Sequence, residues 1–521
     1  MTAPSVEYGL LSPVLIVLGI ALAGVLLEAF LPRAVRFRVQ VTLALAGLLA
    51  ALVALVRVYA SLGSGAGVVA AVGAVTVDRP ALFLQGTILL SSVLILPVIS
   101  ARFPSDAAAP GGGGLASFTP QASAVPGGRA EQVATRAAVI QTEVFPLTMF
   151  AVAGMMLFGA AGDLLTMFIA LEVFSLPLYL MCGLARHRRL LSQEASLKYF
   201  LLGAFSSAFF LYGMALLYGY AGTLSLTGIA AAIGAGTDAS LALIGTALVA
   251  AALLFKVGAV PFQAWVPDVY QGAPTPVTAF MAAATKVAAF GALLRITYVA
   301  VPALKDQWRP MLWAVAILTL ALGTITAITQ KDAKRMLAYS AVAHTGFLLI
   351  GVIAANRAGV SGTLFYLAAY SLTTIGAFAF LTTVRDPDGV EVSELAQWAG
   401  LGRRFPVAGL TFSLFLLSFA GIPLTSGFVG KFAVFKAAAQ GGAAPLVIIG
   451  VAASAIAAYF YVRVIVLMFF TEPPADAPDI TPPNALTVAA IALTLLLTVI
   501  LGTWPQPVLD FAEGAAKFLG S

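Results

Sequence analysis

The sequence predicts an all-α integral membrane protein of about fourteen transmembrane helices. Of its 521 residues, 61% are hydrophobic and only 10% are charged, whereas soluble domains contain about 25% charged residues. The mean hydropathy is +1.00. No water-soluble fold can bury this much apolar surface, so the composition indicates a chain that lies in a lipid bilayer.

Apolar stretches long enough to cross about 30 Å of hydrocarbon, roughly 20 residues each, recur along the whole chain. We expect them at residues 10–31, 39–60, 81–101, 143–161, 163–185, 197–220, 240–263, 275–300, 310–329, 335–356, 361–384, 406–435, 445–470 and 483–503. The first stretch lacks the basic leader and cleavage site of a signal peptide, so we expect it to be a retained helix.

The basic residues in the predicted loops indicate the orientation. Fifteen lie in odd-numbered loops: Arg33, Arg36, Arg38, Arg102, Arg129, Arg136, Arg186, Arg188, Arg189, Lys331, Lys334, Arg335, Arg385, Arg403 and Arg404. Five lie in even-numbered loops: Arg79, Lys305, Arg309, Arg357 and Lys436. Because cytoplasmic loops carry the excess of Lys and Arg, we expect the odd loops in the cytoplasm and both termini outside.

Loop composition divides the chain into four parts. Residues 1–103 hold three spans, and 104–140 form a stretch rich in glycine, proline, serine and alanine that includes four consecutive glycines. We expect this stretch to be a flexible cytoplasmic linker. Residues 141–470 form the helical core, and 471–521 hold the last helix and a tail.

The reactive side chains that hold most cofactors are nearly absent. Cys182 is the single cysteine, and His187 and His344 are the two histidines. They are too few for an iron–sulfur cluster, a disulfide framework or a zinc site, so we expect no cofactor or metal in this chain. The formal net charge of +6 lies in short loops that set topology, which argues against nucleic acid as a partner.

Ionisable residues inside the predicted spans are the main functional signal, because each costs about 2.5–3.5 kcal/mol to insert. Glu172 lies nine residues after Asp163, about 13 Å along a helix and hence near the bilayer midplane. We favour a functional role for the four groups with no short route to the interface: Glu172, Lys256, Lys286 and Lys431.

Four other residues have a structural interpretation at least as strong. Lys198 near a helix start is as consistent with snorkelling as with function, and for Arg295 we favour snorkelling. Glu28 lies close to a helix end, where a packing role is favoured. His344 is equally consistent with packing and with a proton relay.

A buried lysine suits proton transfer because burial favours its neutral form, whereas a nearby carboxylate restores the charge. Two unit charges about 4 Å apart at an effective dielectric of about 20 interact by about 4 kcal/mol. Moving one charge against 100 mV costs about 2.3 kcal/mol. Opening and closing a Glu172–Lys256 pair is therefore enough to load and release one proton.

Two spans are interrupted by proline, at Pro261 and at Pro423. A broken helix provides free carbonyl groups and room for water. Broken helices in corresponding positions of two halves indicate an ion site between structural repeats. Lys256 precedes its proline by five residues and Lys431 follows its proline by eight, so the two lysines do not share a register.

Several motifs in this chain have close counterparts in one family. They are Leu171–Tyr179, Glu194–Phe200, Lys256–Phe262 continued by Trp265–Val277, Lys334–Ser340 followed by His344, and Gly421–Pro423 leading to Gly427–Phe432. These motifs resemble the antiporter-like subunits of respiratory complex I, the proton-pumping NADH:quinone oxidoreductase. The run Pro267–Pro274 is specific to that lineage, and together the motifs cover about residues 140–470.

The resemblance implies two inverted five-helix repeats, formed by helices 4–8 and 9–13, with helices 7 and 12 broken. It also implies proton-transfer roles for Glu172 with Lys198 and Lys256, for Lys286, for His344 on a connecting polar axis, and for Lys431 at the exit. One departure is Gln263, where many relatives have histidine. Glutamine does not titrate, so a proton route at that position needs water.

The family also implies the setting of the protein. It is expected in a bacterial plasma membrane, as a non-redox subunit of a translocase whose partners are the other membrane-arm subunits and the lipid bilayer. Flavin, iron–sulfur clusters and quinone are expected on partner subunits, and the chain alone is not a catalyst. Lysines on helices 8 and 12, and the absence of a long lateral helix, favour a branch other than the distal subunit.

Two other functions compete with this interpretation. The first is a subunit of a multi-subunit cation/proton antiporter, which shares much of the motif pattern. The second is a non-conducting scaffold, against which the cost of the embedded charges argues.

Overall fold

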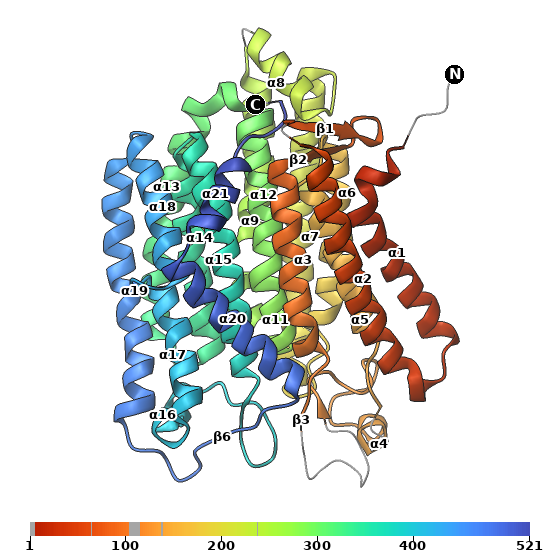
Figure 1. Ribbon diagram of the computed structural model, residues 1–521, viewed down its shortest axis with the longest axis vertical. Coiled ribbons are helices and arrows are strands. Elements are labelled where there is room, and N and C mark those ends of the chain that lie inside the picture. The colour runs from red at the N-terminus through yellow and green to blue at the C-terminus, as the bar shows by residue number, and fades with distance from the viewer. Residues whose placement is uncertain (1–5, 64, 104–114, 137–138, 237, 521) are drawn as a thin grey trace.

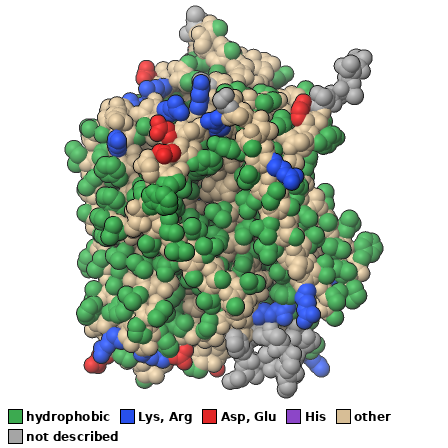
Figure 2. Space-filling model, in the orientation of Figure 1, with side chains coloured by type: hydrophobic (Ala, Val, Ile, Leu, Met, Phe, Trp, Pro, Cys, Tyr) green, Lys and Arg blue, Asp and Glu red, His purple; other side chains and the backbone are tan. Residues whose placement is uncertain are grey.

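The computed structural model describes residues 6–63, 65–103, 115–136, 139–236 and 238–520. Its helices lie side by side in one bundle, with α1 and α2 at one flank and α19 at the other (Figure 1). Hydrophobic side chains cover the middle of the face seen in Figure 2, and the charged side chains on it lie near the two ends. The molecule thus has the surface expected of a bilayer protein.

The fourteen predicted spans are present, so the predicted all-α fold is confirmed. The described chain has twelve helices long and apolar enough to cross a membrane, and the shorter α5 and the α17–α18 pair complete the set. The spans are α1 (Tyr8–Phe30), α2 (Arg33–Ser61), α3 (Arg79–Ile99), α5 (Val144–Phe158), α6 (Leu164–Cys182), α7 (Arg189–Ala221), α9 (Ser240–Val257) with α10 (Trp265–Gly272), α11 (Thr275–Phe280) continued by α12 (Lys286–Arg295), α13 (Lys305–Thr329), α14 (Ala333–Ile353), α15 (Arg357–Leu381), α17 (Pro406–Ala420) with α18 (Ser426–Gln440), α19 (Ala444–Phe470) and α20 (Ala485–Thr503).

The connections contain short elements at both ends of the bundle. The helices are α4 (Arg129–Arg136), α8 (Leu226–Ala235), α16 (Leu401–Arg404) and α21 (Gln506–Gly514). Three antiparallel two-stranded ladders pair β1 (Gly67–Ala70) with β2 (Val75–Asp78), β3 (Arg102–Phe103) with β4 (Leu115–Ala116), and β5 (Val384–Arg385) with β6 (Asp479–Ile480). The odd-loop elements α4, β3, β6 and α16 lie at one end, and β1, β2 and α8 lie at the other (Figure 1).

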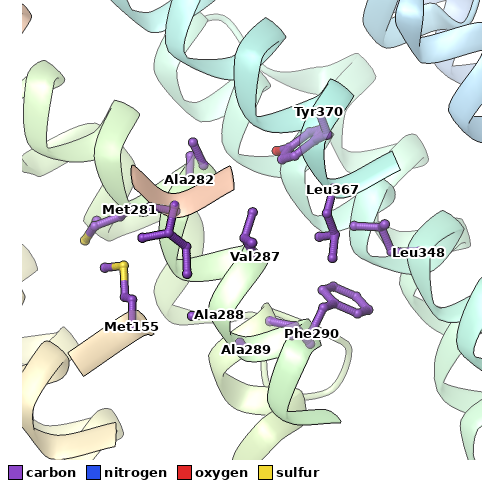
Figure 3. Packing of buried hydrophobic residues seen from close by; sticks show 14 of the residues in the cluster. Met155, Met281, Ala282, Val287, Ala288, Ala289, Phe290, Leu348, Leu367 and Tyr370 are labelled. Atoms are coloured by element: carbon purple, nitrogen blue, oxygen red, sulfur yellow. The ribbon is translucent and has the colours of Figure 1, made fainter. Parts of the chain in front are cut away.

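The centre of the bundle is the continuous span 275–300 together with α14 and α15. These three are 94–100% buried over their most apolar window, whereas α1, α19 and α20 are at most 33% buried and lie at the surface. Figure 3 shows side chains of α12, among them Val287 and Phe290, near Leu348 of α14 and Leu367 of α15. The most buried helices of the bundle are therefore the ones that carry Lys286 and His344.

Both predicted helix breaks exist and have the same local cause. α9 is followed by Gly258 at φ 74° and α17 by Gly421 at φ 82°. Left-handed backbone of this kind favours glycine and ends a helix. Each glycine is followed within three residues by a proline, so the helix cannot resume at once.

Part of the segment predicted to be a flexible linker packs against the core. Residues 104–114 lie outside the described residues. The backbone N–H of Thr119 donates to the carbonyl of Leu184, which follows α6. The buried Arg189 at the start of α7 forms an ion pair of 3.1 Å with Glu131 of α4. Arg189 also donates to the backbone carbonyl of Gln121, so the described half of this segment is attached to α7 at several points.

Candidate functional site

Lys256 lies in the last turn of α9, directly before the first break, and is 3% exposed. Its Nζ donates to Ser175 Oγ at 2.7 Å and to Tyr179 Oη at 3.1 Å, both on α6. The rings of Phe174 and Tyr199 lie 5.5 and 5.6 Å from the same nitrogen. The lysine is therefore held by two hydroxyl groups inside an aromatic cage.

Glu172 is on the same helix, three residues before Ser175, so the two side chains lie about one helical turn apart. Its Oε1 accepts a hydrogen bond of 2.5 Å from Ser207 of α7. Among the described residues Glu172 forms no ion pair with Lys256, although the sequence suggested that they act as a pair. Ser175 thus contacts Lys256 directly and lies one helical turn from Glu172.

Lys198 is not enclosed in the bundle as a buried proton carrier would be. Its side chain is 42% exposed and forms ion pairs with Glu194 at 2.7 Å and with Asp268 of α10 at 2.8 Å. Asp268 also pairs with Arg335 of α14 at 2.8 Å. Because α7 begins at Arg189, Lys198 is not near the helix start, and its network ties α7 to both α10 and α14.

Lys286 lies in the middle of the bundle at the start of α12 and is 4% exposed. Its Nζ donates to the carbonyl of Ala341 at 2.5 Å and to Thr345 Oγ1 at 2.7 Å. Thr345 in turn donates to the carbonyl of Val257 at 2.6 Å. A hydrogen-bonded chain thus runs from Lys286 to the residue next to Lys256.

A small cavity joins the two lysines. It has a volume of about 10 Å³ and is lined by Lys256 and Lys286, by Trp265 and Tyr270, and by Thr285. The Thr285 hydroxyl is buried without a hydrogen-bond partner among the described residues. A cavity of this size is at the lower limit for one water molecule, and the polar lining supplies the partners that such a molecule needs.

His344 on α14 is buried, with 2% of its surface exposed. Its Nδ1 is 2.7 Å from Tyr366 Oη, and its Nε2 is 3.5 Å from Tyr461 Oη. Its ring centroid is 4.8 Å from that of Tyr370 and 5.4 Å from that of Phe419. The Tyr370 ring also lies 5.3 Å from Lys286 Nζ, so one aromatic ring contacts both groups.

Lys431 lies on α18 after the second break and is 4% exposed. Its Nζ donates to the carbonyls of Phe419 and Ala420, which end α17, and to Ser454 Oγ, each at 2.9 Å. The Phe347 ring lies 4.5 Å from the nitrogen. A side chain at Gly421 would place its Cβ 2.9 Å from Lys431 Cδ, so this close approach requires glycine.

The structure brings four of the six residues singled out in the sequence into one buried line, in the order Lys256, Lys286, His344 and Lys431. Glu172 lies beside one end of that line, and Lys198 lies outside it. The hydroxyls that connect the line were not predicted, because which serine, threonine or tyrosine faces a lysine depends on tertiary packing.

The structural roles of two other embedded charges became clear from their partners. Arg295 does not snorkel: it is 1% exposed and forms a bidentate pair with Asp78 at 2.8 and 3.1 Å. Asp78 is also the N-cap of α3, and the run Asp78-Arg79-Pro80 is a helix-start signal that could have revealed it. Glu28 pairs with Arg36 at 2.8 Å, in agreement with a packing role.

Two polar residues near the line were not expected to be buried. Lys334, assigned to a loop from the sequence, is 5% exposed in the first turn of α14 and donates to the carbonyl of Ala273 at 2.7 Å. Gln263 lies within the first break, and its Oε1 is buried without a hydrogen-bond partner among the described residues.

Comparison with known proteins places this chain in a family. Residues 161–457 match the family described as NADH:quinone oxidoreductase/Mrp antiporter, transmembrane. A protein of Rhodococcus opacus (strain B4) named NADH-quinone oxidoreductase subunit N is 63% identical over 529 aligned positions, covering 99% of this chain and 97% of that protein. The matched region contains all six candidate residues.

Two solved structures have the same fold. A chain of respiratory complex I from Thermus thermophilus with bound Aureothin matches with a TM-score of 0.76 and 32% identity over 96% of this chain and 100% of that chain. A chain of the Mrp complex from Dietzia sp. DQ12-45-1b matches with a TM-score of 0.81 and 23% identity, over 98% of this chain and 97% of that one. The second likeness concerns the fold alone.

Proposed function

The chain belongs to the NADH:quinone oxidoreductase/Mrp antiporter family, and on that premise we propose that it is a proton-translocating membrane subunit of a respiratory NADH:quinone oxidoreductase. Its relatives carry the name subunit N, the branch that the sequence favoured over the distal subunit. The observation that carries the proposal is the buried line of titratable groups from Lys256 through Lys286 and His344 to Lys431.

In this proposal the first half of the route loads a proton at Lys256. Glu172 and Lys256 exchange it through the Ser175 hydroxyl, which lies 2.7 Å from Lys256 Nζ and can both donate and accept. A change in the local structure that brings Glu172 closer favours the charged lysine, and its withdrawal favours the neutral one. Lys256 then passes the proton toward Lys286 through the small cavity between them.

The second half of the route runs through His344 to Lys431. His344 can hold a proton on one nitrogen while the other accepts, and tyrosine hydroxyls flank both of its nitrogens. Lys431 is the last titratable group of the line. The two carbonyls that end α17 and the Ser454 hydroxyl accept three hydrogen bonds from Lys431, and only its ammonium form has three N–H groups to donate.

Lys198 has a positioning role in this scheme rather than a carrier role. Its ion pairs connect α7 to α10, and Asp268 carries the connection on to Arg335 of α14. We expect α7, α10 and α14 to fix the positions of Lys256 and Lys286 relative to each other. A shift of α10 would therefore change the distance between the two buried lysines.

Further parts of the proposal concern the assembly. The chain itself supplies no redox cofactor, and flavin, iron–sulfur clusters and quinone belong to partner subunits in the membrane-spanning complex. It contributes to a translocase without being a catalyst alone. Both termini lie on the outer side of the bacterial plasma membrane, since basic residues are concentrated in the odd loops.

A second candidate is a subunit of a cation/proton antiporter, which the fold shared with the Dietzia Mrp complex favours. The sequence identity is 23% for that chain against 32% for the Thermus complex I chain and 63% for the Rhodococcus protein. The respiratory function is therefore the better interpretation.

The test is to purify the tagged chain in mild detergent and identify the proteins that accompany it. We expect a large assembly with flavin and iron–sulfur subunits and with NADH:quinone activity that a complex I inhibitor blocks. Recovery with a few small membrane proteins, sodium-dependent proton exchange and no electron transfer would contradict the proposal and support the antiporter.

A further inference from the structure

A large basic cavity lies away from the line of lysines, where α1, α2 and α3 leave the bundle at the end that carries the odd loops. Its volume is about 1260 Å³. The charged lining consists of five arginines and two glutamates: Arg33, Arg36, Arg38, Arg102, Arg129, Glu28 and Glu143. Apolar side chains of the α1–α2 region and of α4, including Phe37 and Val133, line the rest.

Most of the positive charge in this cavity is not neutralised by the protein. Glu28 forms an ion pair with Arg36 at 2.8 Å and also accepts hydrogen bonds from Gln40 and Thr142. Among the described residues, no carboxylate lies within ion-pair distance of the other four arginines. The remaining carboxylate, on Glu143, is exposed.

Arg102 is the clearest example of a cavity arginine without a carboxylate partner. Its guanidinium lies 3.8 Å over the Phe37 ring, and its Nε is buried without a hydrogen-bond partner among the described residues. Burial, and after it the charge of Arg38, lower the pKa of Arg102. A partly buried cation next to another cation is unfavourable unless an anion is bound, so this end of the cavity favours a negative group.

The surroundings add an apolar component. Val25 on α1 lies one turn before Glu28 and is 48% exposed, and Phe30 at the end of α1 and Val35 in the first turn of α2 are 82% and 45% exposed. The basic cavity therefore opens next to a lipid-facing apolar surface at the depth where headgroups lie. A free anion would use only the arginines, whereas an amphiphile would use both.

We propose that this cavity binds the headgroup of an anionic phospholipid, with its acyl chains against the exposed side chains of α1 and the α1–α2 turn. The lipid phosphate accepts hydrogen bonds from Arg102 and its neighbours Arg38 and Arg129. Basic pockets beside transmembrane helices at the cytoplasmic surface have the chemistry for this class of ligand. The bound lipid would join α4 to the three-helix N-terminal part.

The test uses the whole respiratory assembly in polymer-bounded native membrane discs and a photoactivatable phosphatidylglycerol, with the matching phosphatidylcholine probe as reference. Labelled peptides are mapped by mass spectrometry. The variant Arg38→Gln/Arg129→Gln removes two cavity charges, and Arg57→Gln/Arg403→Gln removes two exposed charges outside it. We expect the first variant to lose labelling of residues 25–38 and 120–143 roughly 30-fold, and the second to keep it.

Two further variants keep the test decisive. Arg38→Lys/Arg129→Lys retains the charge and should retain labelling. If the double glutamine variant does not assemble, Arg129→Gln alone, on α4 outside the membrane helices, should still lower labelling roughly fivefold.

Three results would overturn the proposal. Equal labelling in the cavity and control variants, or equal labelling by phosphatidylcholine, would exclude an anionic lipid. Displacement of the probe by millimolar inorganic phosphate would identify a free-anion site instead. Cross-linking of the cavity to an acidic segment of a neighbouring subunit, without lipid labelling, would identify a protein contact.

Discussion

The two broken helices hold their lysines by different chemistry. Before the first break, Lys256 donates to two hydroxyls on a neighbouring helix, Ser175 and Tyr179. After the second break, Lys431 donates to two carbonyls freed by the break itself. A hydroxyl can accept a hydrogen bond from a lysine or donate one to its neutral amine, whereas a carbonyl can only accept.

The two breaks also differ in whether a carboxylate lies near the lysine. Glu172 lies one turn from the serine that binds Lys256, whereas residues 333–381 and 406–470 contain no Asp or Glu. On the proposed function, the first break therefore has the carboxylate needed to change the charge of its lysine. The second has a site whose lysine is held by fixed dipoles, so repeats of the same topology are suited to different steps of one transfer.

The largest effect on stability is expected at Arg295. This buried cation is held by a carboxylate, whereas Lys256 is held by hydroxyls and Lys431 by carbonyls. Arg295→Gln would leave Asp78 charged and unpaired inside the bundle, at a cost of about 3–5 kcal/mol. We expect the subunit to be lost from the assembled complex, as measured by native gel and immunoblot. Asp78→Asn/Arg295→Gln should restore part of the assembly, and equal loss in the single and double variants would contradict pairing as the cause.

Smaller losses of stability should distinguish the lysine at the second break from the lysine at the first. Lys431→Met leaves the Phe419 carbonyl without its donor, at about 1–3 kcal/mol if it stays dry, whereas Ala420 still accepts from Ser454. Lys256→Met leaves hydroxyls, and Ser175 already donates to the Leu171 carbonyl. Thermal unfolding of the purified complex should therefore show a lower Tm for Lys431→Met than for Lys256→Met. The opposite order would show that the carbonyls are not what holds Lys431.

A matched serine pair tests the same difference through function. Ser175→Ala removes the hydroxyl proposed to connect Glu172 with Lys256, so proton pumping should fall about 100-fold, the lower end of the range for one positioned proton-transfer group. Ser454→Ala leaves Lys431 with both carbonyls, so pumping should stay within about twofold. Proton uptake into proteoliposomes at a fixed NADH oxidation rate measures both. Equal losses would mean that the two serines play the same part.

The smallest effect is expected outside the spans, at His187 in the loop between α6 and α7. Burial lowers the pKa of His187, and the charges of Arg186 and Arg385 lower it further. The unfolded chain then binds more protons, so stability falls as the pH drops below about 6.5. His187→Gln should lose less Tm between pH 7.5 and 5.5 than the unchanged protein. An identical pH dependence would show that His187 is not the titrating group.

The sequence predicted the spans and both breaks because hydropathy and proline act locally. All fourteen spans are present, and Pro261 and Pro423 mark the two interruptions. The candidate line was partly predictable, since a lysine in an apolar helix is costly wherever it points. Lys198 was harder to judge because α7 starts at Arg189, earlier than its hydropathy suggests.

What could not be predicted were the partners. Asp78 and Arg295 are 217 residues apart in the chain, and the hydroxyl of Thr345 joins helices whose packing no local pattern reveals. The burial of Lys334 was also missed, because a lysine beside basic loop residues is usually solvated.

The central claim is that proton transfer passes through Lys256 under control of Glu172. The most direct test measures protons pumped per NADH oxidised in proteoliposomes that contain the assembled complex with Glu172→Gln or Lys256→Met. The account predicts that both variants assemble and that pumping through this subunit is lost, so the ratio falls. An unchanged ratio in both variants would contradict it.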